Sequence, residues 1–285
     1  MKNKIFIKWP RYLVCCVLLT HALTLSAQQS DQQISPEDSL WESLLSKVQV
    51  WSGDSVVSRR RVANHRFIQD LGRLVRTQKA WNLPLQELYP VSVLNSPDGL
   101  WKILTWTVLL EQNARRHYGC LMDAEGRLYP LLDQLANRFE EDSVYQGQHW
   151  PGAVYIEALP IRATWNSLPC FAVIGFDARE PFSQRKVVEW LCPDTFQNQV
   201  LVGAPLIRKE NKTMTRYQLH YPRDVRVQMN WDEDQRLVYF DHLISRGLDP
   251  SSSSFDFIPD GSFDGLVWEN NRLVFKEIPN YQPSR

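Results

Sequence analysis

The spacing of apolar residues predicts two helices near the beginning of the chain. Apolar side chains recur at steps of three and four from residue 40 to 48 and again from about residue 56 to 81, and Gly53 separates the two runs. Ser35-Pro36-Glu37-Asp38 precedes the first run. Serine can cap a helix, proline fits its first turn, and acidic residues favour the positive end of its dipole. We therefore expect residues 28–90 to form a helical region with two antiparallel helices.

Beyond residue 90 the apolar period shortens to two. Short apolar runs are separated by turn sequences at residues 97–99, 123–126 and 270–271, and no helical stripe lies between them. The runs cover residues 153–159, 170–176, 186–191, 200–207, 213–221, 225–231, 236–242, 265–268 and 272–277. This pattern predicts an antiparallel β domain over residues 91–285, in which only residues 133–142 favour a short helix.

The expected fold class is therefore α+β and mainly β. An N-terminal helix pair is followed by a large antiparallel β-meander. So many consecutive strands must protect their edges, and a barrel, a sandwich or a small propeller-like arrangement would each do so.

The first 27 residues have the layout of a secretory signal peptide. Four basic residues precede an apolar run from residue 12 to 25, and Leu25-Ser26-Ala27 supplies the small residues of a cleavage site. The apolar run is shorter than the roughly 20 residues of a membrane-spanning helix, although an uncleaved anchor is the alternative. We expect cleavage after Ala27, a mature chain without a transmembrane segment, and a location in the periplasm or outside the cell.

Removal of this leader makes the chain weakly acidic. The whole chain has 32 basic and 32 acidic residues, and four of the basic residues lie in the leader, so 28 basic residues remain against 32 acidic ones, a net charge of −4. This balance gives no electrostatic reason to expect a nucleic-acid partner.

The second predicted helix nevertheless has an arginine-rich face. That face consists of Arg59, Arg60, Arg61, Arg66, Arg73, Arg76 and Lys79. It could contact an acidic surface, anionic lipid or lipopolysaccharide. The preferred interpretation is a solvated face, or one that pairs with the acidic β region.

Three cysteines remain in the mature chain: Cys120, Cys170 and Cys192. An odd number in an oxidising compartment allows at most one internal disulfide. Cys170 and Cys192 can be partners only if their strands are neighbours, and burial of three free thiols is the alternative.

Candidate site residues come from two stretches of the β region. "VYFDHLIS" contains Asp241 and His242, which could serve as an acid/base pair, although adjacent strand residues point to opposite faces. "FDFIPDGSFDG" contains Asp260 and Asp264. We expect Asp260-Gly261 to form a turn in which the carboxylates accept hydrogen bonds from backbone N–H groups.

Neither a metal nor another cofactor is expected. A calcium-binding EF-hand loop starting at Asp256 would place Ile258 and Val267 where oxygen ligands are required. A looser calcium site at Asp260 and Asp264 is the alternative. The chain also lacks the zinc-protease, Cys-x-x-Cys, phosphate-loop and dinucleotide-binding motifs.

Several segments of the C-terminal half resemble a group of exported Bacteroidota proteins of unknown function. The segments include "FAVIGFD", "VLVGAPLI", "VYFDHL" and "FDFIPDGSFDG", and "SPDGLWKILTW" is similar to a strand of the same group. The matching positions are residues 174–177, 203–207, 238–243 and 259–264, with Arg216 and Met229. The resemblance covers most of residues 90–278, with Phe176 in place of a tryptophan and Gly261 inside the final turn as departures. It implies export and a β-rich fold, and no activity.

Together these observations favour an exported, soluble cell-envelope protein that is more a binding or interaction protein than an enzyme. Its expected partner is an unidentified envelope protein or glycan. The alternative is a hydrolase of an unrecognised type that uses carboxylates of the β domain, drawn from Asp177, Asp241, Asp260 and Asp264.

Overall fold

The computed structural model describes residues 35–111, 114–133, 140–246 and 257–283. Within these ranges the predicted fold class is confirmed, because two helices are followed by strands that pair mainly antiparallel. The predicted leader, Asp256 and most of the segment 133–142 lie outside the described residues.

The helix pair consists of α2 (Pro36–Gly53) and α3 (Val57–Arg76). The Ser35 hydroxyl accepts a hydrogen bond of 3.1 Å from the Asp38 backbone N–H, as expected of an N-cap. α3 ends before residue 81 because Gln78 adopts a positive φ of 62°. The chain then continues through two 3-10 turns, η1 (Lys79–Asn82) and η2 (Leu85–Leu88).

The first sheet is a meander with the strand order β1-β2-β3-β4. Its strands are β1 (Ser92–Asn95), β2 (Trp101–Leu109), β3 (Arg115–Asp123) and β4 (Leu128–Leu132). Gly99 and Gly126, with φ of 70° and 82°, occupy left-handed positions in the two predicted turns between these strands.

The second sheet has the order β5-β9-β8-β7-β6. Its strands are β5 (Tyr145–Gln146), which the turn η4 (Gly147–His149) follows, β6 (Val154–Trp165), β7 (Leu168–Asp177), β8 (Ser183–Asp194) and β9 (Gln199–Val202). β12 (Arg216–Pro222) joins it as a partner of β8. β8 thus pairs along one edge with β7 and along the other with both β9 and β12.

The third sheet has the order β11-β10-β16-β15-β14-β13. Its strands are β10 (Ile207–Lys209), β11 (Lys212–Met214), β13 (Met229–Asp232), β14 (Leu237–Ser245), β15 (Phe257–Glu269) and β16 (Arg272–Glu277). Asn270 and Asn271, with φ of 49° and 60°, form the predicted tight turn before β16. β10 runs parallel to β16, an exception to the antiparallel pairing.

Two predicted strands are each divided into two. The run 200–207 separates into β9 and β10 because Gly203 adopts a φ of 87°. The run 213–221 separates into β11 and β12, where the Thr215 hydroxyl donates to the carbonyl oxygens of Glu141 and Ser143 at 3.0 and 2.8 Å. Both breaks move the chain from one sheet to another, which the local apolar pattern does not encode.

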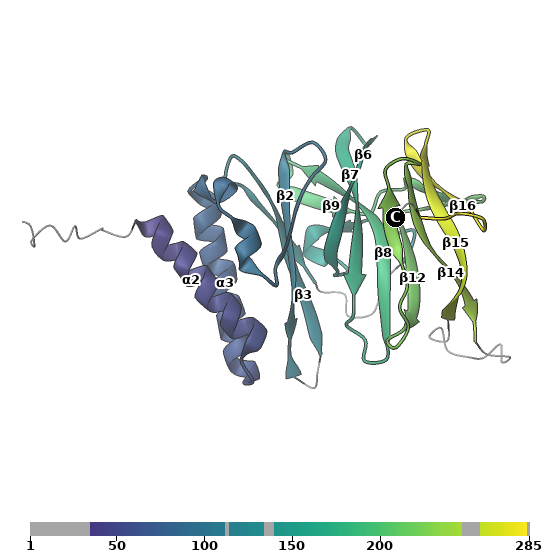
Figure 1. The fold of residues 1–285 in the computed structure, drawn as a ribbon. Coiled ribbons are helices and arrows are strands. Elements are labelled where there is room, and N and C mark those ends of the chain that lie inside the picture. The colour runs from purple at the N-terminus through teal and green to yellow at the C-terminus, as the bar shows by residue number, and fades with distance from the viewer. Residues whose placement is uncertain (1–34, 112–113, 134–139, 247–256, 284–285) are drawn as a thin grey trace, which may run out of the picture.

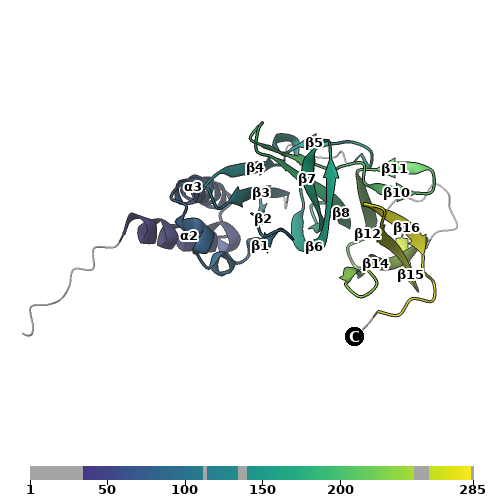
Figure 2. The same ribbon diagram turned by 90° about the horizontal axis from the view of Figure 1, so that it is seen from above.

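The elements stack as successive layers. Figure 1 shows α2 and α3 beside the first sheet, then the second sheet, and finally the third sheet at the opposite end, and Figure 2 shows the same succession from above. An apolar core fills each of the three spaces between layers. Within the described residues none of the sheets closes on itself. The result is a stack of open sheets and not a closed barrel.

The second sheet is covered on both faces, and this explains its composition. β7 is buried continuously from Cys170 to Gly175, because alternate side chains enter the core toward the first sheet and the core toward the third. A strand buried on both sides requires apolar residues in succession.

A disulfide joins Cys170 on β7 to Cys192 on β8, with the two Cα atoms 4.2 Å apart. β7 and β8 are neighbouring strands, as the sequence analysis requires for a disulfide between these two cysteines. Cys120 is a buried free thiol, and burial raises its pKa to about 12. Among the described residues, no helix is both long and apolar enough to cross a membrane.

Candidate functional site

Three of the four predicted site residues, His242, Asp260 and Asp264, lie where β14 and β15 lose their regular register. The register shifts between Asp241 and Leu243, and a hydrogen bond of 2.9 Å joins His242 Nδ1 to Asp264 Oδ2. The His242 side chain is 39% exposed, whereas that of Asp264 is only 9% exposed. The hydrogen bond to Asp264, assisted by the charge of Asp260, raises the pKa of His242 above its ordinary value.

The predicted turn at Asp260-Gly261 is wrong, because both residues lie inside β15. Gly261 takes a φ of 93°, and the chain bulges there without reversing. The predicted capping occurs at Asp260, since the Ser262 N–H and hydroxyl donate to Asp260 Oδ1 at 2.9 and 2.7 Å, whereas the Asp264 carboxylate pairs with the His242 side chain. These hydrogen bonds lower the pKa of Asp260.

Asp241 is engaged elsewhere. Its Oδ2 accepts a hydrogen bond of 2.6 Å from the Gln228 backbone N–H, just ahead of β13. Burial raises the pKa of Asp241. Asp241 and His242 therefore have different partners, as expected for adjacent residues of a strand. Over the ranges that the structure describes, no three His, Cys, Asp or Glu side chains are grouped to hold a metal ion.

Asp177 belongs to a buried polar network between the first and second sheets. His117 Nε2 lies 2.7 Å from Asp177 Oδ1, and Arg185 and Arg179 approach Asp177 Oδ2 at 2.5 and 3.4 Å. Arg179 also pairs with Asp133 at 3.2 Å. Burial alone would raise the pKa of Asp177, but the hydrogen bond with His117 and the charges of the two arginines hold it well below its usual range.

Thr107, His117 and Asp177 form a hydrogen-bonded series that resembles the catalytic triad of an enzyme with a hydroxyl nucleophile. Thr107 Oγ1 is 2.8 Å from His117 Nδ1, and the other ring nitrogen bonds Asp177. However, His117 is only 2% exposed and Asp177 only 6%. With its carboxylate also bound by two arginines, the series joins two sheets, and its histidine and aspartate are almost fully shielded from solvent.

A second buried network crosses from the first-sheet side to β12. Tyr155 OH receives a hydrogen bond of 2.8 Å from the Trp150 indole and donates one of 2.7 Å to Glu189. Arg216 Nε bonds the other oxygen of Glu189 at 3.2 Å. Arg216 is fully buried. The sequence analysis named Asp177 and Arg216 but predicted neither network, because the only local signal of such a network is a polar residue at an inward position of a strand.

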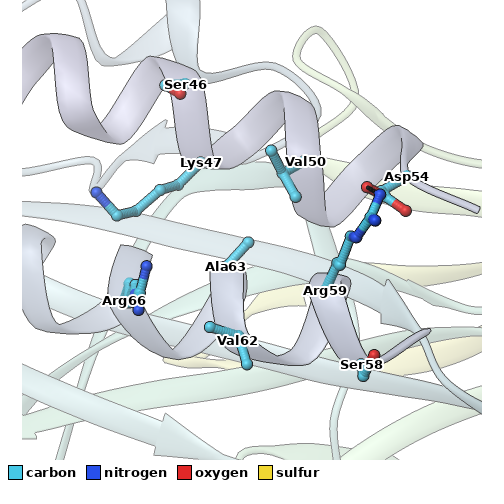
Figure 3. A pocket seen from close by; sticks show the side chains of 9 residues that line it. All are labelled: Ser46, Lys47, Val50, Asp54, Ser58, Arg59, Val62, Ala63 and Arg66. Atoms are coloured by element: carbon cyan, nitrogen blue, oxygen red, sulfur yellow. Dashed lines mark ion pairs between the residues drawn. The ribbon is translucent and has the colours of Figure 1, made fainter. Parts of the chain in front are cut away.

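An open groove lies on the outer side of the helix pair. It has a volume of about 560 Å³, and its lining comes from the second half of α2 and the first half of α3. Figure 3 shows Val50 and Ala63 between the two helices, with Lys47 and Arg66 toward one end and the ion pair of Arg59 with Asp54 toward the other. The groove thus combines an apolar floor with one end that holds an ion pair and another that carries Lys47 and Arg66.

The arginine-rich face of α3 is divided among several environments. Arg60 is buried and donates to the Leu109 and Asp54 carbonyl oxygens at 2.8 and 2.5 Å. Arg61 pairs with Glu111 at 3.4 Å, so part of the face contacts the β region as predicted. In the described part of the chain Arg66 has no ion-pair partner.

No family model matches the sequence, and neither the curated proteins nor the solved structures include a significant match.

Proposed function

We propose that the mature chain is an exported binding protein of the cell envelope, without enzymatic activity, and that the groove between α2 and α3 is its binding surface. Export is supported by the layout of residues 1–27. The disulfide between Cys170 and Cys192 also supports it, because such bonds persist in oxidising compartments.

The groove is the observation that carries this proposal. It is hollow, open to solvent and lined by both apolar and basic side chains, which is the composition of many recognition sites. By contrast, the buried candidates for chemistry are committed to internal hydrogen bonds. In this proposal a partner of the kind expected from the sequence, an envelope protein or a glycan, binds in this groove.

A binding screen tests the proposal. The purified mature chain is presented to arrays of envelope glycans and to purified envelope proteins. The variant Ser58→Trp fills the groove from its rim, since Ser58 is exposed and lines it. Gln69→Trp adds the same indole to an exposed position of α3 outside the groove and serves as the matched control. We expect binding that Ser58→Trp removes and Gln69→Trp retains, and silence across both arrays would refute the proposal.

The alternative function, a hydrolase, has one observation in its favour. His242 and Asp264 form a partly exposed hydrogen-bonded pair of the kind used in acid/base chemistry. A panel of chromogenic esters and glycosides tests it. Hydrolysis by the wild-type chain that is lost in both His242→Gln and Asp264→Asn would support the alternative, and an inactive wild-type chain would reject it.

A further inference from the structure

We infer that the groove between α2 and α3 receives an acidic amphipathic helix of a partner protein, which would complete a three-helix arrangement. This inference deepens the proposed function and rests on it, because it names the chemistry of the occupant of the same groove. It follows from the shape, the apolar floor and the charge of the groove.

The shape of the groove suits a helix. Its lining runs from Ser46 on α2 to Asp54, the C-cap of that helix, and from Ser58 to Arg66 on α3. At 1.5 Å per residue each side is about 12 Å long, or about two helical turns. Two neighbouring helices present ridges and a groove between them, into which the side chains of a third helix fit.

The apolar floor of the groove is recessed below its rim. Ala63 is only 7% exposed, whereas Val62 on the adjoining rim is 51% exposed. The groove is a hollow between longer basic side chains. A narrow apolar stripe of a helix can enter such a hollow, whereas the flat surface of a bilayer cannot reach its floor.

The charge of the groove selects an acidic occupant. Of the six arginines of α3, Arg59 and Arg66 line the groove. At the groove, Lys47 is neutralised by Asp70 at 2.8 Å, and Arg59 faces Asp54 at 3.6 Å. Arg66 lines the groove without an acidic partner among the described residues. An acidic side chain of the occupant would supply that partner.

The structure also indicates why the partner is not a second copy of the same groove. A symmetric contact would bring the same groove of each copy together, and neither Arg66 would gain an acidic partner there, because Asp54, the acidic residue that lines the groove, is already paired with Arg59 of its own chain. The complementary surface must be of opposite charge.

The experiment uses the mature chain and a synthetic helical peptide of about 15 residues, with leucines at steps of three and four and glutamates on both flanks. A second peptide has lysine in place of every glutamate. Fluorescence anisotropy measures binding of each peptide at low and high salt. We expect the glutamate peptide alone to bind, and more weakly at high salt because exposed ion pairs are screened.

Three variants locate the site. Arg66→Glu should weaken binding by about tenfold, since it replaces an attraction with a repulsion. Val62→Asp should weaken it as well, and its exposed position allows the fold to remain intact, which circular dichroism checks. Arg76→Glu is the matched control, because Arg76 is exposed on the same helix outside the groove. It should bind as the wild type does.

Four results would overturn the inference: no binding of the glutamate peptide, equal binding of the lysine peptide, equal weakening by Arg66→Glu and Arg76→Glu, or displacement of the peptide by phosphatidylglycerol vesicles. The last would assign the groove to an anionic lipid surface. If the arrays of envelope components give groove-dependent binding while the glutamate peptide does not bind, only the identity of the occupant is refuted. If both experiments are silent, the proposed function also fails.

Discussion

Replacement of Arg216 by methionine should destabilise the fold more than any surface substitution. The Arg216 guanidinium donates to Glu189 Oε2 at 3.2 Å and to the Ser143 and Val202 carbonyl oxygens at 3.1 and 3.4 Å. It also lies 4.7 Å from the centre of the Tyr145 ring. Methionine has similar length but provides none of these donors.

The expected magnitude follows from the charge left behind. Glu189 is only 2% exposed and would retain Tyr155 OH, at 2.7 Å, as its side-chain donor. Removal of one partner of a buried ion pair costs about 3–5 kcal/mol, because the other charge remains buried without compensation. For a chain of this size, that loss corresponds to a fall in Tm of about 6–20 °C.

Guanidinium chloride unfolding, followed by tryptophan fluorescence, measures the free energy of unfolding. Arg208→Met on β10 is the control, because Arg208 is exposed and donates to the Glu210 carbonyl oxygen at 3.0 Å. It should change the free energy of unfolding by less than about 0.5 kcal/mol.

A second substitution separates lost charge compensation from lost packing. Glu189→Gln, added to Arg216→Met, removes the buried charge and should restore part of the stability. The reasoning is refuted if Arg216→Met lies within about 1 kcal/mol of the wild type. It is also refuted if the double variant is no more stable than Arg216→Met.

Three further measurements test other features. Reduction of the disulfide between Cys170 and Cys192, 22 residues apart, should lower the free energy of unfolding by about 3 kcal/mol, and identical denaturation curves with and without reductant would contradict this. Burial, followed by the charge of Arg185, lowers the pKa of His220 to about 4. As pH falls, the histidine of the unfolded state, with a pKa of about 6.5, takes up a proton before that of the folded state. The free energy of unfolding should therefore fall as pH drops from about 6.5 toward 4. His220→Gln should flatten that part of the pH profile, and an unchanged slope would count against the assignment. The raised pKa of His242 means that its stabilising contribution is complete below about pH 6.5 and is lost as pH rises through the folded-state pKa; an NMR titration should show Asp264→Asn lowering that pKa, and no difference between the two titrations would remove Asp264 as the cause.

The elements that the sequence predicts well are those set by local pattern. The cap at Ser35 and the apolar stripe of α3 act within a few residues, and so do the paired asparagines 270 and 271. The sequence reading places the helices and most strands correctly because periodicity and turn chemistry are read over such short distances.

The features it does not predict depend on residues far apart. His117 and Asp177 are 60 positions apart, and Arg216 is 27 positions from Glu189. Nothing near either residue identifies its partner. The contact of His242 with Asp264 lies at a bulge, and a bulge shifts the register that strand alternation would predict.

The groove is likewise a property of packing. α3 has an apolar stripe and basic residues, and these are visible in sequence as an amphipathic helix. Which arginine is neutralised, and which remains available, is decided by where α2 and the end of β2 lie. Arg61 meets Glu111 and Arg59 meets Asp54, while Arg66 stays at the edge of the hollow.

Because β8 pairs with β7, β9 and β12, insertions and deletions within this strand should not be tolerated. Deletion of one residue inside β8 would rotate every later side chain of the strand to the other face, which would separate Cys192 from Cys170 and displace partners in two cores together. The hairpin tip that follows is different: Phe196 is 96% exposed there. An epitope tag or a fluorophore-bearing insertion should be tolerated at that tip, because no residue of the tip lines the groove between α2 and α3.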